Sequence, residues 1–488
     1  MSHRKEMKIT RHLHELSAIG PVYLVGGSLR DDILGRPSKD YDFAVPGNAR
    51  AFSEAVARRV GARVIEIGKD DRTVYRVVLG KEILDFSPME GEEIEKDLKR
   101  RDFTINAMAY DLQSERLIDP VDALDDIRSK TIRLISEKAI LDDPVRMVRA
   151  FRFAAVLGFA IAPETVAAIS RHRGLITRSA KERISAEAMS MMEAERSFPC
   201  LREMDRAGLL GQIIPELEPC RGCLQNEIHG RDVFEHAMGT YEEIESILSP
   251  PQEDGPLWPE FSAPIQGYLE QGNRKGLLKW AALLHDVGKP ETRSVDPTGK
   301  VRFLGHEQVG AAMVRDICSR LRMSGQSRSY MTFVVQKHLL PLFLFDAFER
   351  KSLTSKGMVG FARKYQDDII GLLIHSVADE RAKARASDES ICKLVSFLRR
   401  IMSTYFRDLK PKMAEPRLID GHDLMRHFNL KPSRRLGRLL QKVEEARLRG
   451  EVKTKKEAME LIGTWLQLEG DAGIEPATPS SGGLCSIR

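Results

Sequence analysis

The chain has 488 residues, of which 42% are apolar and 30% charged, with a formal net charge of +5 and a pI near 8.7. This length exceeds one hydrophobic core, so we expect two to four domains of a soluble globular protein. The start of the chain lacks the apolar core of a signal peptide, no apolar run approaches a membrane span, and six scattered cysteines indicate a reducing compartment. These features exclude a disulfide scaffold and predict a cytoplasmic protein with no membrane partner.

Residues 22–34 predict a strand, a glycine turn and a helix. Val22–Val25 is a short β-branched run, and Leu29–Leu34 is helical in character and ends at Gly35. Between them lies a turn whose backbone N–H groups can closely approach a ligand, formed by Gly26, Gly27 and Ser28.

The following strand carries two acidic residues, Asp40 and Asp42. Side chains two residues apart lie on one face of a strand, so both carboxylates should point the same way. Neighbouring carboxylates repel each other unless cations lie between them, and oxygen ligands suit the Mg²⁺ that accompanies phosphates. A bare Asp-x-Asp is usually a polar surface strand, but one placed after a glycine turn predicts catalytic magnesium ligands.

The segments GGSLRD and DYDF together resemble the nucleotidyltransferase core of class II tRNA nucleotidyltransferases (CCA-adding enzymes) and bacterial poly(A) polymerases. The resemblance implies an α+β fold, in which a head with a small mixed sheet precedes an all-α neck, an HD domain and a C-terminal helical domain. It also implies that residues 26–28 contact the nucleotide triphosphate through backbone N–H groups and that Arg30 contacts it through charge.

The rest of the head predicts a helix and three strands. The helix covers residues 48–60 with Asn48 as its N-cap, and the strands cover residues 63–67, 73–79 and 82–86. Asp85 lies on the last strand, where this superfamily would have a third metal-binding carboxylate. A strand-end role for Asp85 is equally open.

Residues 97–110, DLKRRDFTINAMAY, match the second motif of the family. The resemblance places three side chains beside the ribose and triphosphate of the nucleotide: Arg101, Asp102 and Asn106. An arginine offers a planar fork to phosphate, whereas in isolation the same sequence would more often be a solvated charge run.

Residues 142–153, DDPVRMVRAFRF, match the next motif, although Asp142 stands where the family usually has Glu. We expect Asp143 and Arg146 on one helix face at i, i+3. The resemblance implies that this pair reads the base edge and selects CTP and ATP, with Arg149 and Arg152 completing the nucleotide-binding set. The later Glu182-Arg183-x-x-x-Glu187 resembles a motif that braces the neck, and an ordinary intrahelical ion pair is the alternative for residues 143 and 146.

The segment between the strand of Asp85 and the second motif is short, covering only residues 87–98. Family members that complete the whole CCA end usually have a longer loop here, and members that add only the two cytidines are shortened. The segment therefore favours the hypothesis of an enzyme that adds C alone.

Histidine and aspartate residues dominate the chemistry of the second half. Their order resembles the HD superfamily of metal-dependent phosphohydrolases, and imidazoles with carboxylates suit Ni²⁺, Mn²⁺ or Mg²⁺. The candidate ligands are His236, His285, Asp286 and Asp379, with His306 and His338 available for a second metal or a phosphate. A phosphatase or 2′,3′-cyclic phosphodiesterase activity would suit the repair of damaged tRNA ends.

The C-terminal segment is basic and then changes to Gly, Pro and Ser. Phosphate contacts need only positive charge, so we expect tRNA binding by shape through Arg434, Arg435 and Arg438. A solvated helix face is the alternative, and residues 469–488 are expected to be disordered.

The predicted domains are a head (1–135), a neck (136–215), an HD domain (228–395), a basic module (396–468) and a tail (469–488). The predicted reaction is two-metal addition of C, and possibly A, from CTP and ATP to the 3′ end of tRNA, without a nucleic-acid template and with no protein partner evident. The alternative functions are a poly(A) polymerase, a phosphohydrolase whose first half binds RNA, and a non-catalytic RNA-binding protein.

Overall fold

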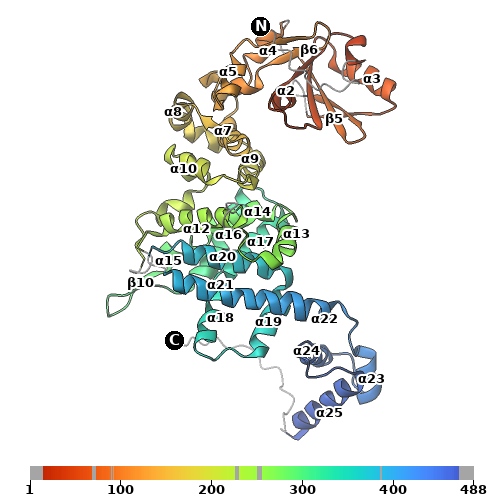
Figure 1. The fold of residues 1–488 in the computed structure, drawn as a ribbon, viewed down its shortest axis with the longest axis vertical. Helices are drawn as coiled ribbons and strands as arrows, with labels where there is room; N and C mark the ends of the chain where they lie inside the picture. Colours follow the sequence, from red (N-terminus) through yellow and green to blue (C-terminus); the bar gives the residue numbers. More distant parts are fainter. Residues whose placement is uncertain are drawn as a thin grey trace, which may run out of the picture. The chain divides into compact units, whose positions relative to one another are not determined.

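The computed structural model describes residues 15–68, 73–89, 91, 93–225, 230–249, 255–384 and 387–471. The chain divides into two compact units by its internal contacts. The first unit comprises residues 1–257, 269–336 and 381–385, and the second comprises residues 258–268, 337–380 and 386–488. The predicted α+β class is confirmed, because one mixed sheet precedes a long series of helices (Figure 1).

The first unit begins with a seven-stranded sheet in the order β3-β4-β5-β2-β1-β6-β7. β2 and β5 are parallel, whereas all other neighbouring strands in this sheet are antiparallel. The strands are β1 (Tyr23–Val25), β2 (Asp40–Val45), β3 (Val64–Ile67), β4 (Val74–Leu79), β5 (Glu82–Pro88), β6 (Ala109–Asp111) and β7 (Arg116–Ile118).

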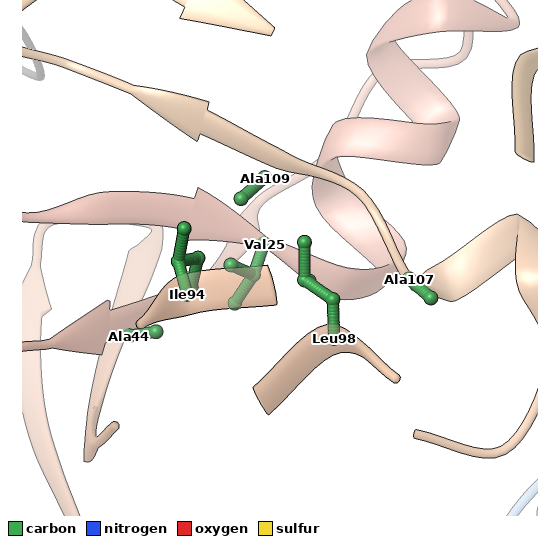
Figure 2. Close-up of a cluster of buried hydrophobic side chains, with 6 residues drawn as sticks. All are labelled: Val25, Ala44, Ile94, Leu98, Ala107 and Ala109. Atoms are coloured by element: carbon green, nitrogen blue, oxygen red, sulfur yellow. The ribbon is translucent and has the colours of Figure 1, made fainter. Parts of the chain in front are cut away.

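Both faces of this sheet carry buried apolar residues. On one face, side chains of β1, β2 and β6 pack with α4 (Ile94–Leu98) in the cluster of Figure 2: Val25, Ala44, Ile94, Leu98, Ala107 and Ala109. On the other face, Phe43 stacks on Phe86 with ring centroids 5.0 Å apart, and Phe52 of α3 (Ala49–Val60) packs beside Phe86. Because side chains alternate along β2, Asp42 shares the face of Ala44 and not the face of Phe43.

Two local predictions in the head can be compared with the structure directly. The predicted cap of α3 is confirmed, since the Asn48 side chain accepts a hydrogen bond from the backbone N–H of Ala51 at 3.0 Å. The predicted turn over residues 26–28 is wrong, because these residues form the first turn of α2 (Gly26–Ile33). Ahead of β1, Glu15–Ala18 is a short 3₁₀ helix.

The neck is helical, as predicted, and continues into further helices of the first unit (Figure 1). A short parallel pair, β8 (Thr131–Ile132) with β9 (Ala160–Ile161), joins its first helices. α5 (Ala123–Arg128) belongs to the head, and the neck helices are α6 (Glu137–Asp142), α7 (Arg146–Leu157), α8 (Pro163–His172), α9 (Lys181–Glu193), α10 (Phe198–Arg206) and α11 (Leu209–Ile213). Later helices are α12 (Val233–Leu248), α14 (Arg274–Leu284), α15 (Lys289–Thr292), α16 (His306–Arg320) and α17 (Gly325–Lys337).

A small antiparallel hairpin interrupts these helices, formed by β10 (Arg293–Val295) and β11 (Val301–Phe303). The hairpin joins α15 to α16, and the helix that follows it begins at His306.

The second unit is helical, and its last three helices share a core. Leu424, Leu439 and Ile462 are among the buried residues of that core, one from each helix. The helices are α13 (Ser262–Leu269), α18 (Leu340–Glu349), α19 (Ser355–Tyr365), α20 (Ile369–Arg381), α21 (Asp388–Ser403), α22 (Lys410–Ala414), α23 (Gly421–Phe428), α24 (Arg434–Arg449) and α25 (Lys455–Asp471). Most of the predicted disordered tail, from residue 472 onward, lies outside the described residues.

One helical stretch, Gly325–Glu349, is long and apolar enough to cross a membrane by length and composition. The stretch consists of α17 and α18, which are separated by a turn at residues 338 and 339. The turn divides it into two helices, each shorter than the roughly 20 residues that a membrane-spanning helix needs.

Candidate active site

Three carboxylates of the head lie on neighbouring strands. Asp40 and Asp42 are exposed residues of β2, and their spacing places both on one face of the sheet. The parallel register of β2 and β5 pairs Asp42 with Asp85, so Asp85 joins the same face. The surrounding protein atoms raise the pKa of Asp42, and the negative charges of Asp85 and Asp40 raise it further, although Arg101 acts in the opposite direction. A cation would relieve this repulsion, so the residues fit the predicted magnesium site.

Asp85 also has a cationic partner within the protein. Its two carboxylate oxygens accept hydrogen bonds from Nε and Nη2 of Arg76, each at 2.8 Å. Arg76 lies directly opposite Asp85 in the antiparallel register of β4 and β5. The sequence analysis missed Arg76, because only the pairing of the strands shows that it faces a carboxylate.

The N-terminus of α2 lies beside Asp42. Gly26 has a φ of +74°, and a Cβ atom at this position would lie 3.2 Å from Oδ2 of Asp42 and 3.4 Å from Nη1 of Arg101. No side chain caps this helix, so its first backbone N–H groups have no partner within the helix. A helix N-terminus of this kind favours an anion such as a phosphate.

The predicted triphosphate residues of the second motif make contacts within the protein. Arg30 is buried and donates from Nη1 to Oδ1 of Asn106 at 2.7 Å, and it also pairs with Asp31. Asn106 donates to Asp102 at 3.2 Å. Arg101 pairs with Asp97 at 3.0 Å and approaches the Gly26 position. The structure therefore brings Arg30, Asn106 and Asp102 together in one polar network.

Asp102 connects this network to the neck. Burial opposes ionisation of Asp102, but Arg149, Asn106 and the backbone N–H of Phe103 outweigh burial and lower its pKa. Arg149 donates to Asp102 at 3.0 Å and to Glu187 at 2.8 Å. Arg149 of α7 therefore connects Glu187 of α9 with Asp102 of the second motif.

The guanidinium of Arg152 is the second cation held by Glu187, at 2.5 Å from its Oε2. Arg152 also stacks over Phe153 at 4.1 Å from the ring centroid. The second glutamate of the predicted ERxxxE motif thus binds both predicted arginines of α7. These contacts agree with the bracing role that the resemblance implied for that motif.

The prediction that Asp143 and Arg146 lie on one helix is wrong. α6 ends at Asp142, Asp143 is extended (φ −150°, ψ 90°), and α7 begins at Arg146. The cause is Pro144, because proline disfavours the helical conformation of the residue before it. Asp143 and Arg146 therefore do not share one helix face.

Both members of this predicted base-reading pair have other partners. Asp143 accepts two hydrogen bonds from Arg183 of α9, at 2.9 and 2.6 Å. Arg146 donates to the carbonyl of Ala139 at 3.2 Å. Arg183 was seen in the sequence only as part of a bracing motif, and no local pattern could show that it binds a residue 40 positions away.

A second cluster of ionisable groups, within the first unit, surrounds Asp286. Its Oδ2 lies 3.1 Å from Nε2 of His285 and 3.8 Å from Nε2 of His236, and its Oδ1 lies 3.2 Å from Nε2 of His306. All four side chains are buried. Burial opposes ionisation of Asp286, but His285, Lys289 and His306 outweigh it and hold its pKa well below the usual range.

The histidines of this cluster are oriented as metal ligands usually are. Nδ1 of His285 donates to the carbonyl of Ala282 at 2.8 Å, and Nδ1 of His306 donates to the carbonyl of Phe303 at 2.7 Å. Nε2 of each ring is therefore the nitrogen that faces the Asp286 carboxylate. With Nε2 protonated it stabilises the carboxylate, and with Nε2 deprotonated the same atoms could bind a divalent metal together, so the residues fit such an ion.

Lys289 is a member of this cluster that the sequence analysis missed. Its Nζ lies 2.6 Å from Oδ2 of Asp286 and donates to the side-chain oxygen of Gln225 at 2.6 Å. The available signal was its position three residues after Asp286, in the sequence HDVGK. Lys289 supplies the buried carboxylate with a positive charge from the protein itself.

The remaining predicted site residues belong to the second unit. His338 and Asp379 are buried, and the ring of His338 lies 5.7 Å from that of His375. Arg434, Arg435 and Arg438 are exposed on α24, as a surface that contacts phosphate requires.

Four family models match successive parts of the chain. The poly(A) polymerase head domain matches residues 22–133, and the RNA- and SrmB-binding region of poly(A) polymerase matches residues 158–221. The HD domain matches residues 260–383, and domain 2 of tRNA nucleotidyltransferases matches residues 399–462.

Two curated relatives match over most of their length. The A-adding tRNA nucleotidyltransferase of Deinococcus radiodurans is 32% identical over 91% of this chain and 95% of its own. The CC-adding tRNA nucleotidyltransferase of Thermus thermophilus is 31% identical over 90% of this chain and 93% of its own. The homologues are thus divided between A-adding and CC-adding enzymes.

Solved structures share the fold at low sequence identity. The Thermotoga maritima CCA-adding enzyme in complex with tRNA matches 94% of this chain and 97% of its own, with 19% identity and a TM-score of 0.63. Complexes of a CCA-adding enzyme with CTP and with ATP match equally well, with TM-scores of 0.64 and 0.63 over 94% of this chain and 96% of theirs, at 19% and 20% identity. These structural homologues bind tRNA, CTP and ATP.

A mixed sheet with adjacent carboxylates beside a helix N-terminus, followed by helical domains with a histidine and aspartate cluster, defines a nucleotidyltransferase joined to an HD domain. The chain belongs to the class II tRNA nucleotidyltransferase/poly(A) polymerase family with an HD domain, in EC class 2.7.7.

Proposed function

We propose that the head transfers C from CTP, with A from ATP as the open alternative, to the 3′ end of tRNA, which builds or repairs the CCA terminus. The observation that carries this proposal is the alignment of Asp40, Asp42 and Asp85 on one sheet face beside the N-terminus of α2. Family membership supports it, because relatives of more than 30% identity are named for this reaction.

Asp40 and Asp42 would hold Mg²⁺ in this reaction, and Asp85 could share it after partial release by Arg76. Bound magnesium neutralises the triphosphate and promotes loss of the proton of the attacking 3′ hydroxyl. Backbone N–H groups of Gly26, Gly27 and Ser28 would bind phosphate oxygens at the start of α2. Arg101 would add a positive charge beside them, since its Nη1 already approaches Gly26.

Asp143 and Arg146 would choose the base. A carboxylate accepts from the exocyclic amine that cytosine and adenine share, and a guanidinium donates to a ring nitrogen or carbonyl. In the structure Asp143 is held by Arg183 and Arg146 by a backbone carbonyl. Nucleotide binding would therefore exchange these contacts for contacts with the base edge.

We also propose that addition stops after the two cytidines, because the segment over residues 87–98 is short. The relatives leave this point open, since an A-adding and a CC-adding enzyme match with nearly equal identity. The exposed Arg434, Arg435 and Arg438 would contact the tRNA backbone, and the reaction would take place in the cytoplasm.

The experiment uses purified protein, Mg²⁺ and three tRNA transcripts, which end at the discriminator base, at C and at CC. Each receives labelled CTP or ATP, with an unrelated RNA as control. Incorporation of CTP that stops at CC, without ATP addition, supports the C-adding proposal. A single A added after CC shows a full CCA enzyme, A added to the CC transcript without any CTP incorporation shows an A-adding enzyme, and long A tails on the control RNA show a poly(A) polymerase.

A second proposed function belongs to the HD domain. His236, His285, Asp286 and Asp379 would hold a divalent metal such as Ni²⁺, Mn²⁺ or Mg²⁺, with His306 and His338 available for a second metal or a phosphate. The buried cluster around Asp286 supports this proposal for the residues of the first unit. Asp379 and His338 are added because their positions in the sequence fit the HD spacing. Bound metal would supply a hydroxide for phosphate-ester hydrolysis.

Release of phosphate from 2′,3′-cyclic AMP or from an RNA 3′-phosphate tests this second function. Each metal is added in turn to protein that was first treated with a chelator. Loss of hydrolysis in His285→Ala with retention of nucleotide transfer would assign the activity to the HD domain. Equal hydrolysis by the wild type and His285→Ala would reject that assignment.

A further inference from the structure

Two arginines of the predicted nucleotide site lie over the ring of one phenylalanine. The guanidinium carbon of Arg152 is 4.1 Å from the ring centroid of Phe153, and that of Arg30 is 5.1 Å from it. Both distances are within the roughly 6 Å over which the negative face of an aromatic ring attracts a cation. Arg30 belongs to α2 of the head and Arg152 belongs to α7 of the neck, so two separate elements place cations on this ring.

Phe153 is fixed in its position by the protein around it. It is 7% exposed, and the ring of Phe103 meets its ring edge-on, with centroids 5.7 Å apart and planes at 87°. Phe103 directly follows Asp102, which accepts a hydrogen bond from Arg149 of α7 at 3.0 Å. The second motif and the neck together therefore orient the ring on which the two arginines lie.

Arg30 connects this ring with the place proposed for the phosphates. A Cβ atom at Gly27 would lie 3.5 Å from Nη2 of Arg30, so the guanidinium lies against the first turn of α2. The backbone N–H groups of that turn are the ones proposed to bind phosphate oxygens. The contact between Arg30 and Phe153 thus links the phosphate site of the head to a helix of the neck.

Positive charges are close together in this part of the site. Burial lowers the pKa of Arg152, and the charges of Arg149 and Arg30 lower it further, although Glu187 acts in the opposite direction. One more carboxylate would offset the repulsion between the arginines, but it would also repel the triphosphate of a nucleotide. An aromatic ring attracts each cation through its quadrupole and has no net charge. Phe153 can therefore hold the cations without reducing the positive charge that faces a phosphate.

The head and the neck are also held together at a second point. Arg36, which follows α2, donates to the carbonyls of Val156 and Leu157 at the end of α7, each at 3.3 Å. The packing of α2 near α7 therefore does not depend on the ring of Phe153 alone. A change of this ring should alter the arginines on it more than the arrangement of the two helices.

We propose that Phe153 is a positioning residue for nucleotide binding, which holds Arg30 and Arg152 where they bind the triphosphate of CTP or ATP. The inference rests on the proposed nucleotide transfer and adds to it an uncharged residue that acts through two arginines. Contacts with the triphosphate exist both before and during the reaction, so their loss raises KM and leaves kcat nearly unchanged.

The first test compares incorporation of CTP, or of ATP if the wild type adds only A, by Phe153→Leu and Phe153→Tyr. Leucine keeps an apolar side chain without a ring, so KM should rise about tenfold while kcat stays within about twofold. Tyrosine keeps the ring and should leave KM within about twofold of the wild type. KM does not depend on the fraction of folded enzyme, so partial misfolding cannot imitate this result.

Phe151→Leu is the matched control, because Phe151 is a fully buried residue of the same helix. It should lose stability as Phe153→Leu does, but its KM should equal that of the wild type. An unchanged KM in Phe153→Leu, a fall in kcat alone, or an equal rise of KM in Phe151→Leu would overturn the proposal.

A binding measurement separates this inference from the proposed reaction. Isothermal titration with inorganic tripolyphosphate and with CTP, each in the presence of Mg²⁺, requires no transfer. Phe153→Leu should bind both ligands about tenfold more weakly than the wild type. Absence of CTP and ATP incorporation by the wild type would reject the proposed function, whereas wild-type affinity in Phe153→Leu would reject only the role of Phe153. A wild type that binds neither ligand would reject both.

A double variant tests whether Phe153 acts through the arginines. In the Arg152→Met background one of the two cations over the ring is gone, so Phe153→Leu should raise KM by a smaller factor than it does in the wild type. Equal factors in the two backgrounds would show that the ring acts independently of Arg152 and would overturn the proposal.

Discussion

The head and the HD domain each place carboxylates where metals would bind, but the pKa of the central carboxyl is raised in the head and lowered in the HD domain. In the head, Asp42 faces Asp85 and Asp40, and its pKa is raised by the surrounding protein atoms and by these charges. In the HD domain, Asp286 is more deeply buried, yet Lys289 and the histidines lower its pKa.

The two sites differ in whether a protein side chain pairs with the central carboxylate, as Lys289 does with Asp286. The head keeps Asp40 and Asp42 exposed, and the negative charge of Asp40 adds to the repulsion at Asp42, as suits metal ions that arrive and leave with each nucleotide and its pyrophosphate. The HD cluster is enclosed and already holds a lysine ammonium at 2.6 Å. A metal bound there would be a resident of the fold, whereas the head would exchange its metals at every turnover.

The largest expected effect is the loss of transfer in Asp42→Asn. Removal of one metal-binding carboxylate should reduce nucleotide transfer by about 10³-fold or more, because the lost stabilisation amounts to several kcal/mol. The metal-free variant should be at least as stable as the wild type at pH 7, since the change removes a repelled charge. Single-turnover CTP incorporation and urea denaturation measure the two quantities.

The pH dependence of stability sharpens this prediction. The pKa of Asp42 is raised in the folded state, so its ionisation costs stability as the pH rises from about 4. The variant should match the wild type below that pH and gain relative stability above it. Asp125→Asn is the control, since Asp125 is exposed on α5 and should change neither quantity. Near-normal transfer by folded Asp42→Asn would contradict the head assignment.

The opposite response is expected when the HD carboxylate is removed. Asp286→Asn leaves the ammonium of the buried Lys289 without its charged partner, which should destabilise the metal-free protein by about 3 kcal/mol. Urea denaturation at pH 7 measures the loss, and metal analysis should show that the variant no longer retains a divalent ion. Nucleotide transfer by the remaining folded protein should be unchanged.

A double variant separates charge loss from misfolding. Asp286→Asn combined with Lys289→Met removes both buried charges, so it should recover part of the stability lost in the single variant. If the stability lost by the double variant equals the sum of the losses in Asp286→Asn and Lys289→Met, the two side chains, 2.6 Å apart, have no net coupling energy. In that case the contrast between the two carboxylate sites would fail.

Part of the head could be predicted from the sequence, because its signals are local. The strands β1 to β5 and the Asn48 cap of α3 were predicted, whereas α4, β6 and β7 were not. The spacing of Asp40 and Asp42 predicted their common face. Each of these inferences depends on residues that lie within a few positions of one another.

The partners of the site residues could not be predicted in the same way. Arg76 faces Asp85 only because β4 and β5 pair in one register, and Arg183 reaches Asp143 from another helix. The break before Pro144 follows from a local signal, since proline disfavours the helical conformation of Asp143, and the prediction of one helix across residues 143 and 146 failed at this residue.

A smaller effect is expected from Asp143→Ala, which tests the choice of base. Loss of a specific contact to a base edge should reduce discrimination by about tenfold to a hundredfold. The measurement compares incorporation of CTP with that of UTP on the same tRNA transcript. Arg183→Ala is the informative companion, because it frees Asp143 without removing its carboxylate. Unchanged discrimination in Asp143→Ala would remove this residue from the base-reading pair.

The smallest expected effect comes from Gly26→Ala, at the point where α2 meets the head carboxylates. The φ of +74° is unfavourable for alanine by about 1–2 kcal/mol, and the added methyl would lie 3.2 Å from the Asp42 carboxylate. Urea denaturation should show a loss of this size, and transfer should fall because Asp42 and Arg101 are displaced. Gly35→Ala separates the two causes, since Gly35 also has a positive φ but has no atom within 4 Å of its Cβ position. Gly35→Ala should lose stability without losing nucleotide transfer. If both variants lose transfer equally, the close approach of Gly26 to Asp42 is not the reason that the reaction needs glycine at position 26.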